Sequence, residues 1–254
     1  MAARGSISFD RIADDYDRTR GGECRGGAVA DALLPVMSPG PLLEVGVGTG
    51  LVAQALTRRG RVVFGVDLSL PMLRYAQGRV PGRVVAGDAL RLPVRSGSVD
   101  GVVMIHVLHV VGDMTGTLAE AARVLRPGGR LAVSAHVDDE PRSDVSEIVG
   151  ALDRRLRQDG PRPDEEGHVV RTAAGLGLLP AGRFGYPPTG WELSPADWVS
   201  RIEARFASWM WTVDDETWER ESAPAVAALR GLPDQDSPRE ETTEVPLLAF
   251  AAPA

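Results

Sequence analysis

The sequence predicts an α/β fold built on a doubly wound, mostly parallel β-sheet. Continuous Val, Leu and Ile runs recur through the first half of the chain, which is typical of strands buried on both faces. Between them lie stretches with apolar residues three or four positions apart, as amphipathic helices require. This alternation predicts parallel strands with helices on both faces. The 254 residues suit one domain with a modest insertion.

The central part of the chain carries most of this pattern. The runs predicted as strands are LLEV (42–45), RVVFGVD (61–67), RVVAGD (83–88), GVVMIHV (101–107) and GRLAVSAHV (129–137). The intervening predicted helices are LVAQALTRRG (51–60), LPMLRYAQGR (70–79) and GTLAEAARVL (116–125). We therefore expect residues 41–140 to form the main part of the sheet.

Two flanking regions complete the predicted organisation. Residues 1–40 are expected to form a helical cap from FDRIADDYD (9–17) and AVADALLPVM (28–37), joined by the glycine-rich segment RGGECRGG (20–27). The glycines of this join predict a hinge. Residues 141–254 are expected to add the last two strands, GRFGY (182–186) and VPLLAFA (245–251), with a helical insertion near 187–244 before the last strand.

Composition excludes several classes of protein. Hydrophobic residues make up 43% of the chain and charged residues 25%, which excludes disordered and fibrous proteins. All 28 basic residues are arginine, and the chain has no lysine and no asparagine. A lysine Schiff base, a Walker-type phosphate loop and an N-glycosylation site are therefore excluded.

Charge and hydropathy indicate the surroundings of the protein. The net charge is −7, and arginine is nowhere concentrated without nearby acids, so no nucleic-acid partner is expected. The longest apolar run, 102–111, contains two histidines and is too short to span a membrane. The N-terminus is acidic where a signal peptide would be apolar, and the single cysteine, Cys24, suits a reducing cytoplasm. We expect a cytoplasmic protein, monomeric or homodimeric, without membrane contact.

The segment LLEVGVGTG (42–50) is the most informative motif. A strand ends in Glu44, and glycines at alternate positions (Gly46, Gly48 and Gly50) turn the chain into a helix and let a ligand approach the backbone. A dinucleotide fingerprint requires its third glycine at position 51, where Leu51 stands. A dinucleotide-binding oxidoreductase is therefore the less favoured alternative, and the acid before the first glycine suits a cationic ligand.

Four motifs together resemble one family. Glu-x-Gly-x-Gly-x-Gly resembles the first motif of the class I S-adenosylmethionine-dependent methyltransferases, and GVDLS (65–69), GDALRLPVRSGSVDGVVM (87–104) and RVLRPGGRLAVS (123–134) follow in the family's order and spacing. FDRIADDYDRTR (9–20) resembles the cap of the small-molecule, methyltransferase-11-like branch. The resemblance implies a Rossmann-like sheet of seven strands, with S-adenosylmethionine as cofactor and S-adenosylhomocysteine as product.

The resemblance also implies residues that bind the nucleoside part of the cofactor. Asp67 is expected to accept both ribose hydroxyls; the alternative is a helix cap. Asp88 and the amide of Ala89 suit adenine, although Asp88 is also typical of a turn. Leu68 and Met72 are expected to flank the ring, with ordinary core packing as the alternative.

Further residues are expected at the methionine end of the cofactor. Gly46 and Gly48 provide bare backbone, and Glu44 balances the ammonium group. Tyr16 and Arg20 are candidates for the methionine carboxylate, although Arg20 also suits a solvated surface. His106 stands where the family's backbone usually meets the methionine.

His109 is the candidate catalytic base. Family members that methylate hydroxyls often carry a histidine at this place, and imidazole titrates near neutral pH. The alternative is a histidine satisfied by backbone groups in a packed loop. His136 is a second candidate base, near Asp138, Asp139 and Glu140. No metal is expected, because adjacent acids at a strand end are usually solvated.

The sequence thus predicts an enzyme that transfers a methyl group to a small-molecule acceptor, expected to be a hydroxyl of a bacterial secondary metabolite. HVLH (106–109) stands where base-modifying enzymes usually carry an Asn/Asp-Pro-Pro-aromatic tetrapeptide. A protein of this fold that binds the cofactor but acts as a cyclase or isomerase is the main alternative. The tryptophans gather in the insertion, where they either pack it onto the sheet or line the acceptor pocket beside His109: Trp191, Trp198, Trp209, Trp211 and Trp218.

Overall fold

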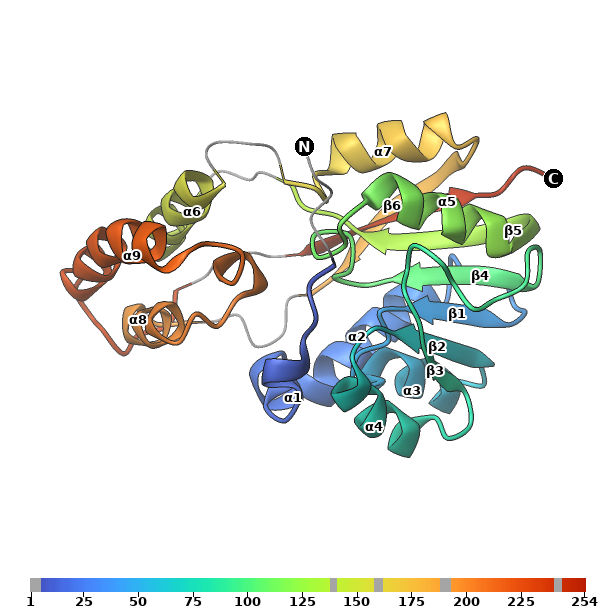
Figure 1. Ribbon diagram of the computed structural model, residues 1–254, viewed down its shortest axis with the longest axis horizontal. Coiled ribbons are helices and arrows are strands. Elements are labelled where there is room, and N and C mark those ends of the chain that lie inside the picture. Colours follow the sequence, from blue (N-terminus) through green and yellow to red (C-terminus); the bar gives the residue numbers. More distant parts are fainter. Residues whose placement is uncertain (1–5, 138–140, 158–161, 188–192, 240–243) are drawn as a thin grey trace. The chain divides into compact units, whose positions relative to one another are not determined.

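The computed structural model divides the chain into two compact units (Figure 1). The first comprises residues 1–137, 163–187 and 244–254, and the second comprises 138–162 and 188–243. Within these units the structure describes residues 6–137, 141–157, 162–187, 193–239 and 244–254. The first unit holds a β-sheet with its helices, and the second is helical.

The sheet of the first unit has seven strands in the order β3-β2-β1-β4-β5-β7-β6. Strands β1 to β5 are parallel to one another, and β7 is antiparallel to both β5 and β6. The strands are β1 (Leu42–Val45), β2 (Val63–Asp67), β3 (Val84–Ala86), β4 (Val99–Met104), β5 (Leu125–Ser134), β6 (Leu179–Tyr186) and β7 (Val245–Ala251). The predicted seven-stranded, mostly parallel sheet is confirmed.

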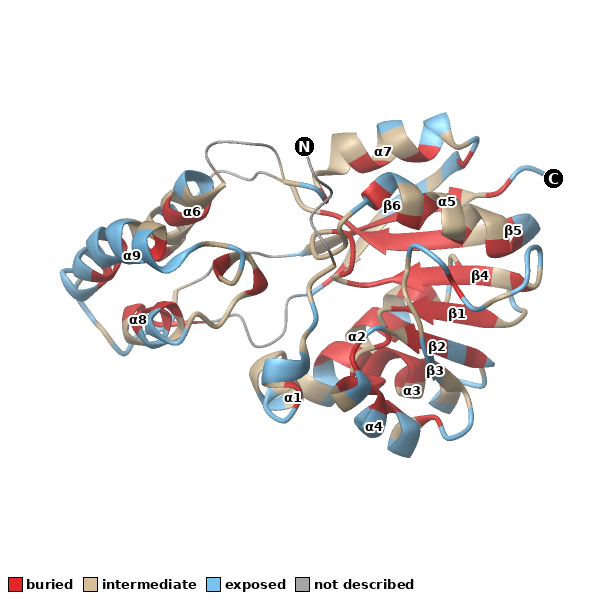
Figure 2. Ribbon diagram, viewed as in Figure 1, coloured by how far each residue is buried: buried red, intermediate tan, exposed pale blue. Residues whose placement is uncertain are grey.

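Helices cover both faces of the sheet, and most residues of the inner strands β1, β4 and β7 are buried between them (Figures 1 and 2). One face packs against α2 (Gly22–Leu33), α3 (Leu51–Arg58) and α4 (Leu70–Arg79), and the other against α5 (Met114–Val124) and α7 (Glu166–Gly175). Neighbouring residues of one strand point to opposite faces. Leu42 belongs to the core that includes α2, α3 and α4, and Leu43 to the core that includes α5 and α7. Continuous apolar runs are therefore required, as the sequence indicated.

The order of the strands creates a crevice at one edge of the sheet. The chain runs outward from β1 through β2 to β3, and then crosses to β4 on the other side of β1. Ligands of open α/β sheets bind beyond the carboxyl ends of the strands at such a reversal. The glycine loop lies here, and Gly46, Gly48 and Gly50 have φ values of 70°, 55° and 84°. A Cβ at Gly46 would lie 2.5 Å from Val107 Cγ2, so both conformation and space require glycine.

The N-terminal elements differ from the sequence prediction. Helix α2 begins at Gly22 rather than residue 28, so most of the expected glycine hinge is helical and the hinge prediction is wrong for that segment. The reason is close packing of two helices: a Cβ at Gly26 would lie 2.8 Å from the backbone oxygen of Leu51. The expected helix over 9–17 is a 3₁₀ turn (Asp10–Ile12) followed by the short α1 (Tyr16–Thr19).

The second unit has a core of its own. It consists of α6 (Asp144–Leu156), α8 (Pro195–Glu203), a 3₁₀ turn (Ser208–Met210) and α9 (Asp215–Arg230). Trp198 and Trp218 are buried in that core, Trp209 and Trp211 pack against it, and Trp191 lies outside the described residues. The two buried tryptophans therefore stabilise the interior of the unit.

Across both units, none of the described helices combines the length and the apolar character that crossing a bilayer requires.

Candidate active site

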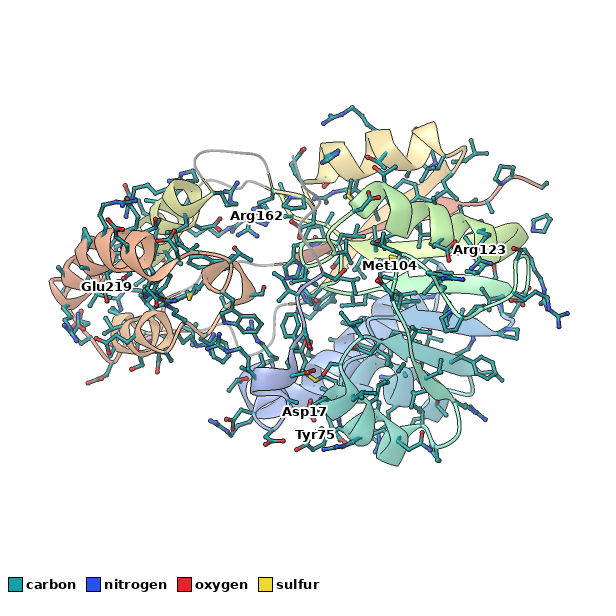
Figure 3. The ribbon with its side chains drawn as sticks, viewed as in Figure 1. Asp17, Tyr75, Met104, Arg123, Arg162 and Glu219 are labelled. Atoms are coloured by element: carbon teal, nitrogen blue, oxygen red, sulfur yellow. The ribbon has the colours of Figure 1, made fainter. Side chains whose placement is uncertain are left out.

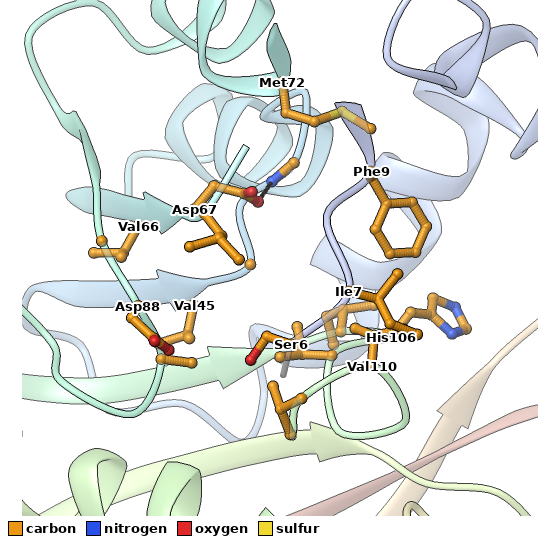
Figure 4. Close-up of a pocket in the computed structure, with 18 of the residues that line it drawn as sticks. Ser6, Ile7, Phe9, Val45, Val66, Asp67, Met72, Asp88, His106 and Val110 are labelled. Carbon is orange, nitrogen blue, oxygen red and sulfur yellow. Dashed lines mark hydrogen bonds between the residues drawn. The ribbon is translucent and has the colours of Figure 1, made fainter. Parts of the chain in front are cut away.

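A pocket opens at the carboxyl edge of the sheet in the first unit (Figure 4). About 690 Å³ of empty space, part of it open to solvent, lies among its lining residues. Its lining residues come from the N-terminal segment, the glycine loop, the ends of β2 and β3, and the loop after β4. The crevice predicted by the strand order is therefore a real cavity.

The N-terminal segment forms one wall of this pocket. Ser6, Ile7, Phe9 and Tyr16 line it, and the backbone amide of Ile7 donates to the carbonyl of Val110 over 2.9 Å. The rings of Phe9 and Tyr16 meet edge to face with their centres 6.1 Å apart. A ligand enclosed here would contact aromatic side chains that lie before α2 in the chain.

Carboxylates of the same segment fasten it to the glycine loop and to α4. Asp17 accepts hydrogen bonds from the Thr49 hydroxyl and the Arg79 guanidinium, both at 2.5 Å. The Tyr75 hydroxyl donates to Asp14 over 2.7 Å. The labelled Asp17 and Tyr75 in Figure 3 mark where the segment meets α4. These bonds must loosen if the wall is to open.

Asp67 is held at the mouth of the pocket by two backbone amides. Its Oδ2 accepts from Gly48 over 2.7 Å, and its Oδ1 accepts from Ser69 over 2.8 Å. Burial raises the pKa of Asp67, and these two amides offset part of that effect. Ser69, not Asp67, caps α4 through its hydroxyl. Each carboxylate oxygen keeps a further lone pair with which to accept a hydroxyl of a ligand.

The predicted adenine residues lie along the same wall of the pocket. Asp88 and Ala89 line it, and the Asp88 carboxylate also accepts from the amide of Leu90 over 2.9 Å. The turn that we weighed as an alternative is therefore present, and it directs the segment toward the pocket. Leu68 is 47% exposed and Met72 only 1% exposed, so Leu68 offers apolar surface while Met72 belongs also to the core.

Glu44 is buried at the end of β1 and does not itself line the pocket. Burial raises the pKa of its carboxyl to about 8, although the amide of Ala53 donates to it. Its Oε2 has no hydrogen-bond partner among the described residues. A buried carboxyl that lacks a partner fits a cationic group supplied by a ligand, because such a charge stabilises the ionised form.

His106 adopts a strained conformation at the end of β4. Its φ is 57°, and its amide donates to the Ser134 hydroxyl over 2.7 Å. Its Nε2 lies 2.7 Å from the Tyr186 hydroxyl, so the imidazole points away from Asp67 and Asp88 (Figure 4). Burial lowers the pKa of His106 well below its ordinary value, so the ring is neutral at pH 7. His106 therefore offers only its carbonyl and backbone surface to the pocket.

His109 does not line the pocket, but it lies beside His106, which does. Its ring meets that of His106 edge to face, with centres 6.4 Å apart. Its Nδ1 is 3.7 Å from Oδ2 of Asp164, a buried carboxylate whose Oδ1 has no partner among the described residues. The His136 amide holds the carbonyl of Asp164 at 2.8 Å, so the end of β5 places this acid. Apo active-site pairs are often this long and shorten only when substrate binds.

The structure brings most of the predicted site residues together. Those that line the pocket are Tyr16, Gly46, Gly48, Asp67, Leu68, Met72, Asp88, Ala89 and His106; those that do not are Arg20, Glu44 and His109. Asp138, Asp139 and Glu140 lie outside the described residues, and within the described ones no group of acids, histidines or cysteines has a metal-binding arrangement.

Sequence reasoning missed several neighbours of the site. Phe9 was part of the cap motif but had no expected role. Asp164 lies just before α7, and Tyr186 is the last residue of β6. Both are far along the chain, and no local motif marks them. Arg25 lies in the glycine-rich segment that was expected to be a hinge. The sequence did not reveal that this segment is helical, and so did not indicate that Arg25 is buried.

Comparison with known proteins decides the family of this site. Residues 43–133, which span β1 to β5 and the glycine loop, match the family described as "Methyltransferase domain". They are a class I, S-adenosylmethionine-dependent methyltransferase domain. The family's cofactor is S-adenosylmethionine.

One curated relative and two solved structures illustrate the similarity. A demethylmenaquinone methyltransferase of Tropheryma whipplei (strain Twist) is 36% identical over 136 residues, which are 49% of this chain and 56% of the relative. The matched part thus spans little more than half of that relative's length. A possible histamine N-methyltransferase of Thermotoga maritima aligns with a TM-score of 0.59 and 18% identity, covering 97% of this chain and 98% of its own. The [4+2]-cyclase SpnF aligns with a TM-score of 0.60 and 17% identity, covering 99% and 100%.

The methyltransferase domain has the groups that its cofactor requires. Asp67 offers two acceptor oxygens for ribose hydroxyls, and Asp88 offers an acceptor for an exocyclic amine. The orphaned Oε2 of Glu44 suits an ammonium, and Gly48 has open space where a side chain would stand. These observations fit the cofactor.

Substitution of Asp67 tests the ribose role. Asp67→Ala should weaken S-adenosylhomocysteine binding by about 1.5–3 kcal/mol, because two charge-assisted hydrogen bonds are lost. Calorimetry should therefore show a dissociation constant about 10- to 150-fold higher. Asp31→Ala, which removes a surface partner of Arg59, is the matched control and should bind normally. Unchanged affinity in a folded Asp67→Ala protein would refute the ribose role.

Proton release tests the role of Glu44. Because its pKa is about 8 without ligand, an arriving ammonium should ionise it and release up to about one proton at pH 7. Calorimetry of S-adenosylhomocysteine binding in buffers of different ionisation enthalpy measures this number, and Glu44→Gln should lower it.

The ligand-free protein offers a second readout of Glu44. The folded state holds a proton that the unfolded chain loses above about pH 4.5, so this contribution to stability should decline from about pH 4.5 to about pH 8. Glu44→Gln should flatten that decline. Equal proton release and equal pH dependence in both proteins would contradict a raised pKa.

Hydrogen exchange tests whether the N-terminal wall moves. Amides of residues 6–20 should exchange faster without ligand than with S-adenosylhomocysteine, since the wall must open for entry. Asp17→Ala should speed that exchange further, because it removes the bonds to Thr49 and Arg79. Exchange that is equally slow with and without ligand would mean that the wall is rigid.

Proposed function

We propose that this protein transfers a methyl group from S-adenosylmethionine to a small-molecule acceptor, at a hydroxyl group. The observation that carries the donor part is Asp67, bonded to the glycine loop through Gly48 at the mouth of the pocket beyond the carboxyl ends of the strands. The relative named demethylmenaquinone methyltransferase, whose name gives a small molecule as acceptor, supports the acceptor class. The acidic net charge of −7 supports a partner other than nucleic acid.

The cofactor supplies an activated methyl group when bound, so the protein needs no covalent nucleophile. The residues of this chain then have two tasks. The first is to position donor and acceptor in line, which accounts for much of the rate in reactions of this type. The second is to remove the proton of the acceptor hydroxyl, which requires a base near the edge of β4.

His109 is the residue that we propose as this base. Its Nδ1 lies 3.7 Å from Asp164 Oδ2, and Nε2 is the nitrogen that we propose accepts the hydroxyl proton. Asp164 would stabilise the imidazolium that forms and hold the ring in one orientation. His106 is unsuited to the task, because its Nε2 lies 2.7 Å from Tyr186 and burial keeps its pKa low.

A cyclase or isomerase of the same fold is the second candidate. The likeness to the [4+2]-cyclase SpnF supports keeping it, since that protein covers this chain almost completely at a similar TM-score. Bases and aromatic walls serve both kinds of chemistry, so fold and site geometry favour neither. We also propose a cytoplasmic location, supported by the single free and exposed cysteine, Cys24.

Methyl transfer itself is the decisive experiment. Incubation with methyl-labelled S-adenosylmethionine and a panel of small hydroxylated acceptors, quinols and natural products included, should yield a labelled small molecule. Acceptor-dependent formation of S-adenosylhomocysteine gives an independent signal. Product formation without label transfer would support the cyclase or isomerase and refute transfer.

Substitution of His109 tests the base. His109→Ala should lower kcat by about 10²–10⁴-fold with little change in S-adenosylhomocysteine affinity, as expected when a general base is lost. Asp164→Asn should lower kcat less and change its pH profile, because it acts through His109. His168→Ala is the control, since this histidine lies on α7 and has no role in the site. Turnover of His109→Ala at the wild-type rate from pH 6 to pH 9 would exclude His109 and favour His136.

A further inference from the structure

Arg25 carries a buried positive charge next to the pocket. It lies on α2 and is only 7% exposed, and its Nε has no hydrogen-bond partner among the described residues. One of its terminal nitrogens lies 3.3 Å from the Tyr16 hydroxyl, and the guanidinium lies 5.5 Å from the centre of the Tyr16 ring. Arginine stays charged in proteins, so this cation cannot be removed by losing a proton.

No acid of the described residues neutralises this charge by direct contact. Within the described ranges, the structure contains no carboxylate at ion-pair distance from Arg25. Asp17 is already paired with Arg79, and Glu44 is protonated at pH 7 because its pKa is about 8. A buried charge without a counter-ion is costly, and such charges are normally paired. The missing anion is therefore expected to come from a ligand.

The position of Arg25 indicates which ligand. Its electrostatic neighbours include Tyr16, which lines the pocket, Tyr186 at the end of β6, and His106 at the end of β4. Asp17 and Glu44 also interact with it electrostatically, without direct contact. The residues for ribose and adenine follow β2 and β3, on the other side of β1 in the sheet. Arg25 thus lies toward the half of the carboxyl edge that the nucleoside does not use.

We propose that Arg25 binds a carboxylate of the methyl acceptor. A guanidinium with unused donors matches a carboxylate in a paired, two-bond geometry. The Tyr16 hydroxyl accepts from Arg25, so its own proton remains as a further donor to an anionic oxygen. The acceptor class is therefore a small carboxylic acid that also carries the hydroxyl to be methylated. This inference rests on the proposed function.

Charge balance supports the acceptor over the donor as the source of the carboxylate. The donor brings a carboxylate of its own, for which Arg20 is the candidate, together with an ammonium and a sulfonium. A second buried cation beside them adds repulsion unless another anion enters. An anionic acceptor offsets both Arg25 and the sulfonium, so donor and acceptor would bind with favourable coupling.

Stability and cofactor binding form the first arm of the test. Arg25→Met should leave the Tm of the ligand-free protein unchanged or raise it, because an unpaired buried charge is replaced by a chain of similar volume. S-adenosylhomocysteine should bind this variant with wild-type affinity by calorimetry. Arg20→Met is the matched control and should weaken that binding.

Binding of a simple carboxylate forms the second arm. Benzoate, with neutral benzamide as its matched control, is titrated by ligand-observed NMR into the wild type, Arg25→Met and Arg25→Lys. Benzoate should bind the wild type better than benzamide does, and Arg25→Met should weaken benzoate binding about tenfold or more. Arg25→Lys should be intermediate, since it keeps the charge without the planar fork. Arg20→Met should bind benzoate normally.

Three results would overturn the inference. The first is a loss of S-adenosylhomocysteine affinity in Arg25→Met, which would give Arg25 to the donor. The second is equal benzoate binding by the wild type and Arg25→Met, or none by the wild type. The third is a large fall of Tm in Arg25→Met, with Arg25→Lys folded but unable to discriminate benzoate from benzamide. Failure of the proposed function is distinguishable from these three results, because it would appear as the absence of S-adenosylhomocysteine binding to the wild type.

Discussion

The hydrogen bond from the Gly48 amide to the Asp67 carboxylate is the interaction on which the site depends. It joins the loop after β1 to the end of β2, two neighbouring strands of the sheet. The loop reaches this position only because its glycines adopt left-handed conformations. The same loop carries Thr49, whose hydroxyl and carbonyl bond Asp17 and Arg79. One short segment thus sets the pocket floor and anchors its N-terminal wall.

Buried polar groups with unused bonding capacity surround the pocket. Glu44 Oε2, Arg25 Nε and Asp164 Oδ1 are buried without hydrogen-bond partners among the described residues. Buried polar atoms are nearly always satisfied in proteins, so each exception calls for an explanation. Other such atoms, among them Asp153 Oδ1 and Arg162 Nε, lie in the second unit. The signs of the three groups around the pocket differ as well: a carboxyl for an ammonium, a guanidinium for a carboxylate, and a carboxylate behind an imidazole. The energy that these groups cost the ligand-free fold is recovered when a ligand supplies the partners.

The sheet order separates the tasks along one edge. The residues proposed to bind the nucleoside follow β2 and β3, and the glycine loop follows β1. His106, His109 and Tyr186 lie at or after the ends of β4 and β6. The neutral His106 and its bond to Tyr186 form the divide between the two halves. His109 lies beside His106 and faces Asp164.

The sequence by itself determined the strands, the glycine loop and the residues that follow each strand directly. Runs such as LLEV and GVVM reveal buried strands because both faces of a parallel sheet demand apolar residues. The resemblance to the family's motifs indicated Asp67 and Asp88, and both line the pocket because residues that closely follow neighbouring parallel strands reach the same edge of the sheet. These features depend on spacing within a few residues.

Only the tertiary structure decided the contacts between distant segments. His106 and Tyr186 are 80 positions apart, and Asp164, which is 55 positions after His109, reaches it from beside the end of β5. Helix α2 starts at Gly22 because Gly26 must pack against Leu51, a contact that helix propensity alone does not encode. The role proposed for Arg25 depends on that helix, because a guanidinium in a flexible hinge would be solvated and need no anion. Burial and pairing are properties of the packed chain, because they depend on which residues folding brings together.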